Sequence, residues 1–580
     1  MQALIDFAAP GGSGAGAVRV AFTAPRAVLV ANTLAEVRPL LDTVHAHATA
    51  GHWCVGYLRY EAAPAFDTAL KAHSPNGPLA WFGVYDEPLP WPDTPPADTA
   101  VLARLNDPDR AAFDTALAEV HAAIAAGDVY QVNHTVQLQG HLGSGSAQAL
   151  FQALQRAQPG GYAACIDSGG EQILSVSPEL FFDWTGGQLL TRPMKGTAPR
   201  GNSATSDADL ANALRASPKE QAENVMVVDM LRNDVSRVAL PHSVKVPRLF
   251  HLEALPSVWQ MTSDVTATTR PGTTLADVFA ALFPCGSVTG APKVRAMQLI
   301  HQLEPGPRGV YCGAVGVVRP GGDATFNVAI RTVTLQGDTL ACGIGSGITA
   351  DAQPDAEWRE WRHKRAFLER ARAPFALLET LALVDGVCRN APLHLARMAS
   401  AAVHFGFPWN ADTALQALHA VQQNHPAGHW RVRLLLQSDG SAQAEAYALS
   451  ATLWPVRLQL GTQAFEMADS EFTRFKTTRR DHYDALVPTD PTVFDMVLWN
   501  ERGELTECTR GNIALRLDGE WVTPPLHCGL LPGVGRAKAL AEGRLTEKVV
   551  WLDDLPRVEA LAFVNSLRGW LPATLVRTAA

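Results

Sequence analysis

The chain has 580 residues, of which 47% are hydrophobic and 18% charged, and its formal net charge is −9. This length exceeds what one hydrophobic core supports, so we expect several domain-sized units. No segment is strongly basic, which excludes a nucleic-acid-binding role. No apolar run of about 18 residues occurs, which excludes a membrane span.

The eight cysteines are scattered and form no CxxC motif. This pattern predicts reduced thiols in a cytoplasmic protein and argues against a zinc site. The N-terminus lacks a basic segment followed by an apolar core, so we expect no signal peptide.

The first predicted region, residues 1–108, is an amino-terminal lobe. It contains β-like runs at 18–22 and 54–58. It ends in the Pro-rich segment EPLPWPDTPPAD, residues 87–98, which we expect to be a linker or surface excursion.

The second predicted region, residues 109–372, alternates amphipathic helices with β-branched strands. A helix is expected over 111–126, where apolar residues recur at helical spacing. A charged helix is expected over 357–372. A new β start follows it, so we place the third region at 373–580.

Four acidic residues are spaced in two similar pairs. Glu220 and Glu223 lie three apart, as do Glu357 and Glu360, and each pair projects from one face of an expected helix. Two such helices facing each other would form a carboxylate cluster suited to Mg²⁺. Solvated helix faces with ordinary salt bridges remain the alternative from spacing alone.

Three Gly-rich segments lie between these helices, at 193–201, 284–300 and 342–351. We expect the last to be a strand followed by a loop of exposed amides. Such loops can bind an anion through successive N–H groups, although each segment alone is equally compatible with an ordinary turn. None matches GxxxxGK[ST] or GxGxxG, so nucleotide binding is not supported.

Six segments, taken in order, resemble the chorismate-binding family, which includes anthranilate, isochorismate and aminodeoxychorismate synthases. They are PMKGTAPRG, PCGSVTGAPK, GVYCGAVG, NVAIRTVTL, CGIGSGITAD and PDAEWREWRHK. The likeness covers about residues 15–370. It implies an α/β fold with a large two-halved β-sandwich and flanking helices, Mg²⁺ as cofactor and chorismate as substrate. The implied metal ligands are Glu223 and Glu360 directly, with Glu220 and Glu357 completing the site. The implied substrate-binding residues are Gly196, Thr197, Tyr311, Arg331, Gly345, Gly347 and Lys364.

Lys195 decides between members of this family. Anthranilate synthases resemble this motif but have alanine there, whereas aminodeoxychorismate synthases have lysine. The resemblance implies that the amine of Lys195 attacks the ring while the 4-hydroxyl departs, after which ammonia displaces it. An anion-binding role for Lys195, and an anthranilate synthase activity, remain alternatives.

One position departs from the pattern. Many relatives have a histidine in the segment SVWQMTSD, where this chain has Gln260. Glutamine cannot act as a general acid at neutral pH, so another group must protonate the departing hydroxyl.

The ammonia source is not evident in the chain. No GxCxGxQ nucleophile motif occurs. The resemblance therefore implies a separate glutamine amidotransferase subunit as partner, with free ammonia as the fallback.

The last 200 residues resemble the fold-type IV pyridoxal-phosphate enzymes, a two-lobed α/β group that includes D-amino-acid aminotransferases and aminodeoxychorismate lyase. The segments that carry the likeness are PLHLARMASAAVHFG, RFKTTRRDHYD, GELTECTRGNIAL, PPLHCGLLPGVGRAKAL and FVNSLRGWLP. The implied roles are covalent cofactor binding and catalysis by Lys476, pyridine pairing by Glu507, and phosphate binding by Arg397, Val534 and Gly535, with Asn565 and Ser566 at the site edge.

This second region also departs from its family. Cys508 and Gly535 replace a common glycine and threonine, and a first strand is missing before Phe375. Either the preceding helix substitutes or cofactor affinity falls. The fusion itself favours a lyase that converts aminodeoxychorismate to 4-aminobenzoate and pyruvate. An aminotransferase-like or inactive domain, and a non-catalytic scaffold, are the rivals. Family members are often dimers, so a homodimer through this domain is a further expectation.

Overall fold

We analysed a computed structural model that describes residues 2–11, 16–92, 96, 98–103, 105–200, 204–255 and 258–576. The chain divides into two compact units, Met1–Pro374 and Phe375–Ala580. The expected boundary near residue 373 lies beside this division.

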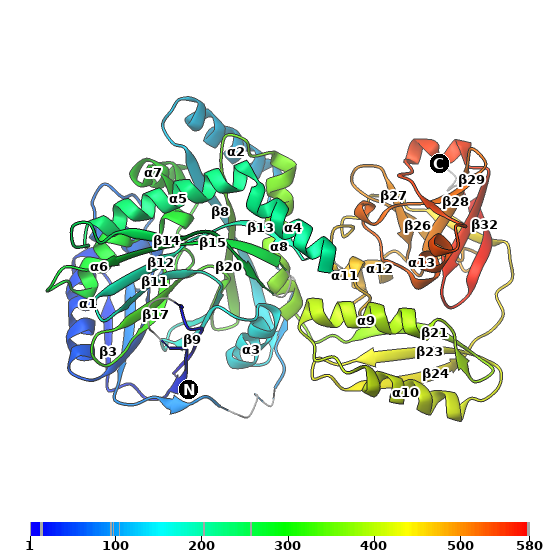
Figure 1. Cartoon of the computed structure of the whole chain (residues 1–580), viewed down its shortest axis with the longest axis horizontal. Helices are drawn as coiled ribbons and strands as arrows, with labels where there is room; N and C mark the ends of the chain where they lie inside the picture. The colour runs from blue at the N-terminus through cyan, green and yellow to red at the C-terminus, as the bar shows by residue number, and fades with distance from the viewer. Residues whose placement is uncertain are drawn as a thin grey trace. The chain divides into compact units, whose positions relative to one another are not determined.

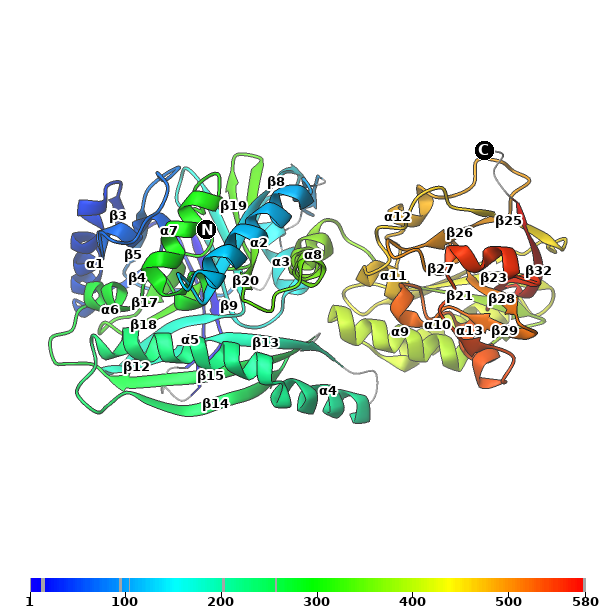
Figure 2. The same ribbon diagram turned by 90° about the horizontal axis from the view of Figure 1, so that it is seen from above.

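The first unit contains two ten-stranded sheets, which are seen in Figure 1 and Figure 2. The first sheet contains β1 (Ala3–Phe7), β2 (Val18–Phe22), β6 (Leu89–Pro90), β7 (Val101–Leu102), β8 (Gln131–Ser144), β9 (Tyr162–Asp167), β10 (Gln172–Ser177), β16 (Gly290–Ala291), β19 (Thr332–Gln336) and β20 (Thr339–Ile348). The second contains β3 (Ala27–Ala31), β4 (Trp53–Leu58), β5 (Ala80–Tyr85), β11 (Leu180–Thr185), β12 (Gln188–Arg192), β13 (Met194–Pro199), β14 (Lys245–Ala254), β15 (Val258–Thr268), β17 (Ala314–Val318) and β18 (Ala324–Val328).

The two sheets pack face to face. Ile5 and Ile173 of the first sheet and Tyr57 and Val315 of the second belong to one fully buried cluster. Burial of apolar surface between the sheets stabilises the sandwich. The two-halved β-sandwich predicted from the resemblance is confirmed.

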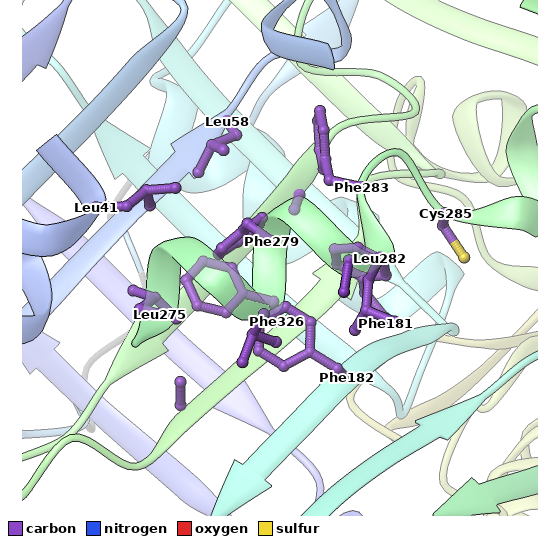
Figure 3. Packing of buried hydrophobic residues seen from close by; sticks show 14 of the residues in the cluster. Leu41, Leu58, Phe181, Phe182, Leu275, Phe279, Leu282, Phe283, Cys285 and Phe326 are labelled. Atoms are coloured by element: carbon purple, nitrogen blue, oxygen red, sulfur yellow. The ribbon is translucent and has the colours of Figure 1, made fainter. Parts of the chain in front are cut away.

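Helices cover the outer faces of the sandwich. They are α1 (Leu34–Thr49), α2 (Arg110–Ala125), α3 (Ala147–Ala157), α4 (Ala204–Ala216), α5 (Pro218–Ser236), α6 (Leu275–Leu282), α7 (Lys293–Leu303) and α8 (Pro354–Ala371), with 3₁₀ turns η1 (Tyr60–Ala65) and η2 (Gly286–Val288). Helices α1, α5 and α6 pack on the second sheet around an aromatic cluster shown in Figure 3. There Phe279 meets Phe182 and Phe326 at ring-centroid distances of 5.3 and 5.0 Å. Helices α2, α3, α7 and α8 pack on the first sheet.

The first hundred residues are interleaved with later ones in both sheets. Strand β1 pairs with β9, and β4 pairs with β17. The boundary drawn at residue 108 therefore does not separate two compact units. Part of the Pro-rich segment lies outside the described residues, and its Leu89–Pro90 pairs with β2 rather than acting as a free linker.

The second unit has two lobes, and each is built on its own sheet. The first lobe contains β21 (Leu377–Val384), β22 (Val387–Cys388), β23 (His429–Leu436), β24 (Ala442–Ala448), α9 (Ala391–Phe405) and α10 (Ala411–Asn424). The second lobe contains β25 (Val456–Leu460), β26 (Asp495–Trp499), β27 (Leu505–Cys508), β28 (Asn512–Leu517), β29 (Glu520–Thr523), β30 (Thr546–Glu547), β31 (Ala560–Asn565), β32 (Gly569–Val576), α11 (Glu471–Arg474), α12 (Asp481–Asp484), α13 (Val534–Ala541), η3 (Leu526–Cys528) and η4 (Leu552–Arg557).

The helices of the described residues include none that combines the length and apolarity required to cross a bilayer.

Candidate functional site

The two predicted acid pairs lie on two helices, α5 and α8. Helix α5 begins where the Ser217 side chain accepts a hydrogen bond from the Glu220 backbone N–H, which places Glu220 and Glu223 in its first two turns. Glu357 and Glu360 occupy the corresponding part of α8. Both helices were predicted from apolar periodicity, and both are present.

The four carboxylates are close enough to repel one another. Burial raises the pKa of Glu220, and Glu360 and Glu357 raise it further. Burial likewise raises the pKa of Glu223 and of Glu357, with added repulsion from Glu360. Partial burial would also raise the pKa of Glu360, but the Lys364 ammonium, 2.6 Å from its carboxylate, lowers it overall.

Carboxylate groups are ligands for a hard cation such as Mg²⁺. No three acidic, histidine or cysteine side chains of the described residues converge tightly enough to hold a metal ion. Glu357 Oε2, however, is buried without a hydrogen-bond partner. A divalent cation would satisfy that oxygen and relieve the repulsion. The donor set therefore fits Mg²⁺.

Lys195 lies on β13 and reaches across the sandwich to β20. A Cβ built on Gly347 would lie 3.0 Å from Lys195 Nζ and would overlap the side-chain amide of the buried Gln131. The lysine amine therefore lies between the two sheets, against the backbone of the Gly-rich strand.

Gln260 holds the strand next to Lys195. Its Nε2 donates to Gly196 O at 2.8 Å, and Thr197 Oγ1 donates to its Oε1 at 3.0 Å. Gly196 has φ +88°, and a Cβ there would lie 3.0 Å from Glu220 Oε2. Gly196 and Thr197, expected in a loop, are thus in strand β13, and Gln260 positions them rather than acting as an acid.

The predicted substrate-binding residues gather near β20. Lys364 Nζ donates to Gly345 O at 2.8 Å, and Arg331 donates to the carbonyl of Lys364. The Tyr311 ring occupies the space that a Cβ on Gly343 would need. Gly345 and Gly347 lie within the strand, paired with β8, rather than in the expected loop. Pairing of β20 with β19 ends at Cys342, so the other edge beyond it has no strand partner among the described residues.

Glu179 is a further candidate that was not predicted from the sequence. This residue is 3% exposed, and its Oε1 has no hydrogen-bond partner. Burial raises the pKa of Glu179 to about 7, although a hydrogen bond with Ser287 and the charges of Lys195 and Lys364 act to lower it. Its carboxyl is therefore partly protonated near neutral pH, within electrostatic range of the candidate nucleophile. The sequence does contain one indication of this residue, because Glu179 is an acid beside apolar residues in the segment SVSPELFF.

In the second unit, Lys476 follows α11 and its carbonyl accepts from Leu378 N. Burial, together with Arg480 and Arg397, lowers the pKa of Lys476 to about 7. A neutral amine, which covalent chemistry with an aldehyde requires, is therefore accessible near neutral pH.

Glu507 lies on β27 and is 2% exposed. Its Oε1 accepts from Tyr483 Oη at 2.5 Å and from Leu531 N at 3.1 Å. Its Oε2 has only a long contact, 3.4 Å, with Asn512 Nδ2. Burial raises the pKa of Glu507 to about 8. One oxygen is therefore fixed, and the other is suited to a pyridinium N–H.

Arg397, Val534 and Gly535 also come together. Arg397 on α9 donates to Pro532 O at 3.0 Å, just before the start of α13 at Val534. A Cβ on Gly535 would lie 2.9 Å from Ser566 N, so glycine permits close approach of the two backbones. The start of a helix beside a guanidinium suits a phosphate group. The residues present therefore fit pyridoxal phosphate.

Comparison with known proteins agrees with this geometry. The chorismate binding enzyme family matches residues 13–370. The chain belongs to the chorismate-binding enzymes. The amino-transferase class IV family matches residues 376–576, which lie in the second unit. The predicted fold class, a chorismate-binding sandwich followed by a smaller two-lobed α/β domain, is confirmed.

Three relatives illustrate the similarity of the chorismate-binding unit. Aminodeoxychorismate synthase component 1 of Salmonella typhimurium is 43% identical over 42% of this chain and 53% of its own length. Anthranilate synthase component 1 of Streptomyces coelicolor is 37% identical over 48% of this chain and 54% of its own. The structure of anthranilate synthase component I from Streptococcus pneumoniae matches with a TM-score of 0.54 and 23% identity, over 63% of this chain and 92% of that one. The chain thus spans about half the length of these two curated relatives.

Gly347→Ala tests the crowding around Lys195, the candidate nucleophile of the chorismate-binding unit. The new methyl group would overlap the Gln131 amide and press on Lys195 Nζ. We expect kcat/KM for chorismate to fall by about 10²-fold, because small displacements of a reacting group are costly. Gly170→Ala is the matched control, since a Cβ there would meet nothing within 4 Å. Equal loss in both variants in a chorismate-consumption assay would contradict this placement.

Proposed function

We propose that the chain is a bifunctional enzyme of 4-aminobenzoate synthesis. The first unit aminates chorismate to 4-amino-4-deoxychorismate, and the second releases pyruvate to give 4-aminobenzoate. The observation that carries the proposal is Lys195, whose amine lies between the sheets and interacts electrostatically with Glu179, a buried carboxyl with a raised pKa of about 7. The name of the Salmonella relative supports the same substrate and product class.

In the amination, Lys195 Nζ forms a bond to the ring as the 4-hydroxyl leaves. Glu179 gives its proton to the leaving oxygen, so that water departs and the carboxylate remains. Ammonia then displaces the lysine and leaves nitrogen on the ring. Glu179 thus fills the role that Gln260 cannot.

The other residues of this unit bind and orient the substrate. Glu220, Glu223, Glu357 and Glu360 would hold Mg²⁺, which supplies a Lewis acid for a substrate carboxylate. Arg331 and the N–H groups at the open edge of β20 suit a second carboxylate.

In the second unit, Lys476 is the base and acid that moves protons at the substrate. Pyridoxal phosphate, when bound, supplies an electron sink. Glu507 Oε2 holds a proton at the pyridine nitrogen, and Arg397 with the N–H groups of Val534 and Gly535 binds the phosphate. The fusion of the two units supports the lyase activity, because the product proposed for the first unit is the substrate of such a lyase. An aminotransferase activity in this unit remains the second candidate, supported by the class IV match.

We further propose that a glutamine amidotransferase subunit supplies the ammonia in a cytoplasmic setting. The word "component" in the relatives' names supports a partner. Self-association through the second unit is part of the same proposal.

The product's regiochemistry tests the proposed function. Purified chain with chorismate, Mg²⁺, an ammonium salt and pyridoxal phosphate is expected to give 4-aminobenzoate, identified by chromatography. Formation of 2-aminobenzoate would instead assign an anthranilate synthase.

The acid role of Glu179 predicts a pH dependence. Its raised pKa of about 7 keeps the carboxyl protonated below that pH, so kcat/KM should fall as pH rises through about 7. In Glu179→Gln this limb should vanish and the rate should drop by about 10²-fold or more. The assay holds free ammonia constant across the pH series. A variant that keeps the wild-type profile would remove Glu179 from the chemistry.

A further inference from the structure

Three side chains form a continuous hydrogen-bonded chain in the second unit. His394 Nδ1 lies 2.6 Å from Glu379 Oε2, and His394 Nε2 lies 2.8 Å from Ser566 Oγ. Glu379 and His394 are each 1% exposed. Glu379 is on β21 and His394 on α9, whereas Ser566 follows β31, so the chain links the two lobes.

The charge on Glu379 fixes where one proton lies. Its carboxylate also binds Arg397, with Nε and Nη2 at 2.8 and 2.6 Å. Although burial opposes ionisation, Arg397 and His394 lower the pKa of Glu379 to about 2. An ionised carboxylate only accepts hydrogen bonds, so Nδ1 of His394 carries a hydrogen.

The direction of the Ser566 hydroxyl then depends on the other ring nitrogen. In a neutral imidazole Nε2 is an acceptor, so the hydroxyl hydrogen points at His394. In an imidazolium Nε2 donates to Ser566 Oγ, and the hydroxyl hydrogen is released. Asn390 Nδ2 donates to the same oxygen at 3.2 Å, so that oxygen is held in place in either state.

Ser566 borders the region that fits a phosphate group. Its backbone N lies 2.9 Å from the position a Cβ on Gly535 would take, and Arg397, the partner of Glu379, reaches the carbonyl of Pro532. Gly535 has no hydroxyl to offer, whereas the adjacent Ser566 has one. A phosphate dianion here is an acceptor and needs that hydroxyl hydrogen.

We propose that His394 is a positioning residue for the cofactor phosphate, a role that rests on the proposed cofactor of this unit. When the dianion binds, one proton from solvent adds to His394 Nε2. The Ser566 hydroxyl hydrogen turns from that nitrogen to a phosphate oxygen, and no covalent bond is exchanged elsewhere.

The charges around His394 come from Glu379, Arg397 and Lys476, and an incoming phosphate adds to them. Glu379 and Arg397 already neutralise each other. The Lys476 amine interacts electrostatically with both Glu379 and Arg397. A phosphate dianion adds negative charge near Ser566, which stabilises an imidazolium beside it. Proton uptake and phosphate binding are therefore linked.

The experiment compares pyridoxal phosphate with pyridoxal, which lacks the phosphate, on the full chain. Dissociation constants come from absorbance titration, and proton uptake comes from calorimetry in buffers of different ionisation enthalpy. His394→Gln keeps hydrogen-bonding groups but cannot take a charge, and Ser566→Ala removes the hydroxyl. Ser400→Ala, at an exposed position on α9, is the control.

We expect both site variants to weaken pyridoxal phosphate binding by about tenfold and to leave pyridoxal binding unchanged. Wild type should take up about one more proton per bound phosphate ester than His394→Gln does. Unchanged phosphate preference and equal proton uptake would overturn the role of His394, with the cofactor site intact. If wild type binds neither compound, the cofactor proposal itself fails, and this inference fails with it.

Discussion

Lys195→Ala is expected to abolish amination of chorismate, lowering its rate by about 10³-fold or more. The amine lies between the sheets, 3.0 Å from the position that a Cβ on Gly347 would take. Without the lysine, the covalent intermediate does not form, so ammonia has no lysine amine to displace from the ring. Chorismate consumption and product identity are measured by chromatography with saturating ammonium and Mg²⁺.

The control for this variant is Lys245→Ala, at an exposed position on β14. It should retain wild-type activity. If Lys195→Ala still forms aminodeoxychorismate at a comparable rate, Lys195 is only an anion-binding residue and the nucleophile assignment is wrong.

Lys476→Ala is expected to stop the pathway at aminodeoxychorismate, with pyruvate release falling by about 10³-fold or more. Its lowered pKa of about 7 makes the neutral amine available to move the proton. Pyruvate is measured with a coupled dehydrogenase. The absorbance of bound pyridoxal phosphate gives a second readout, since its covalent link should be lost.

The direction of the pH dependence of cofactor attachment follows from the same pKa of Lys476. Below about 7 Lys476 is an ammonium group, and above it the amine is neutral, so cofactor attachment in wild type should increase as pH rises through about 7. Lys538→Ala, on the outward face of α13 and paired with Glu542, is the control. Pyruvate release that survives Lys476→Ala would assign the lyase reaction to a different group.

Much of the local structure was predictable from the sequence. The strand at Val18–Phe22 and the helices carrying the acid pairs were expected from periodicity, and they are β2, α5 and α8. Periodicity reports which face of an element is buried, so it predicts single elements well. It does not report which distant strands pair. The pairing of β1 with β9 therefore could not be foreseen.

The Gly-rich segments show where local reasoning fails. Gly196, Gly345 and Gly347 were expected in loops, yet all three lie in strands. Glycine is needed there because side chains from other elements occupy the space of a Cβ, as Gln131 does at Gly347. That crowding is a tertiary property and leaves no local pattern beyond the glycine itself.

Glu179 was missed for a similar reason. Its chemistry depends on burial and on the charge of Lys195, which is on β13, whereas Glu179 directly precedes β11, and β15 and β12 lie between these two strands in the same sheet. Gln260, by contrast, is excluded as an acid by its side-chain chemistry alone, but its hydrogen bonds to Gly196 and Thr197 are visible only in the structure. The chemistry of a side chain can be predicted from the sequence, but its burial and its neighbours in the fold cannot.

Carrying both catalysts on one chain would raise the local concentration of the intermediate without a dedicated channel. This makes the two units separable by mutation. Each single variant should lose one step and keep the other, which distinguishes two working sites from one site and a remnant.

The most direct test of the account is therefore a complementation assay for 4-aminobenzoate. Lys195→Ala and Lys476→Ala proteins are each incubated with chorismate, Mg²⁺, ammonium and pyridoxal phosphate, and then mixed. The account predicts that neither variant alone forms 4-aminobenzoate, whereas the mixture does, because the intermediate made by one is consumed by the other. Formation of 4-aminobenzoate by Lys476→Ala alone, or failure of the mixture while wild type succeeds, would contradict it.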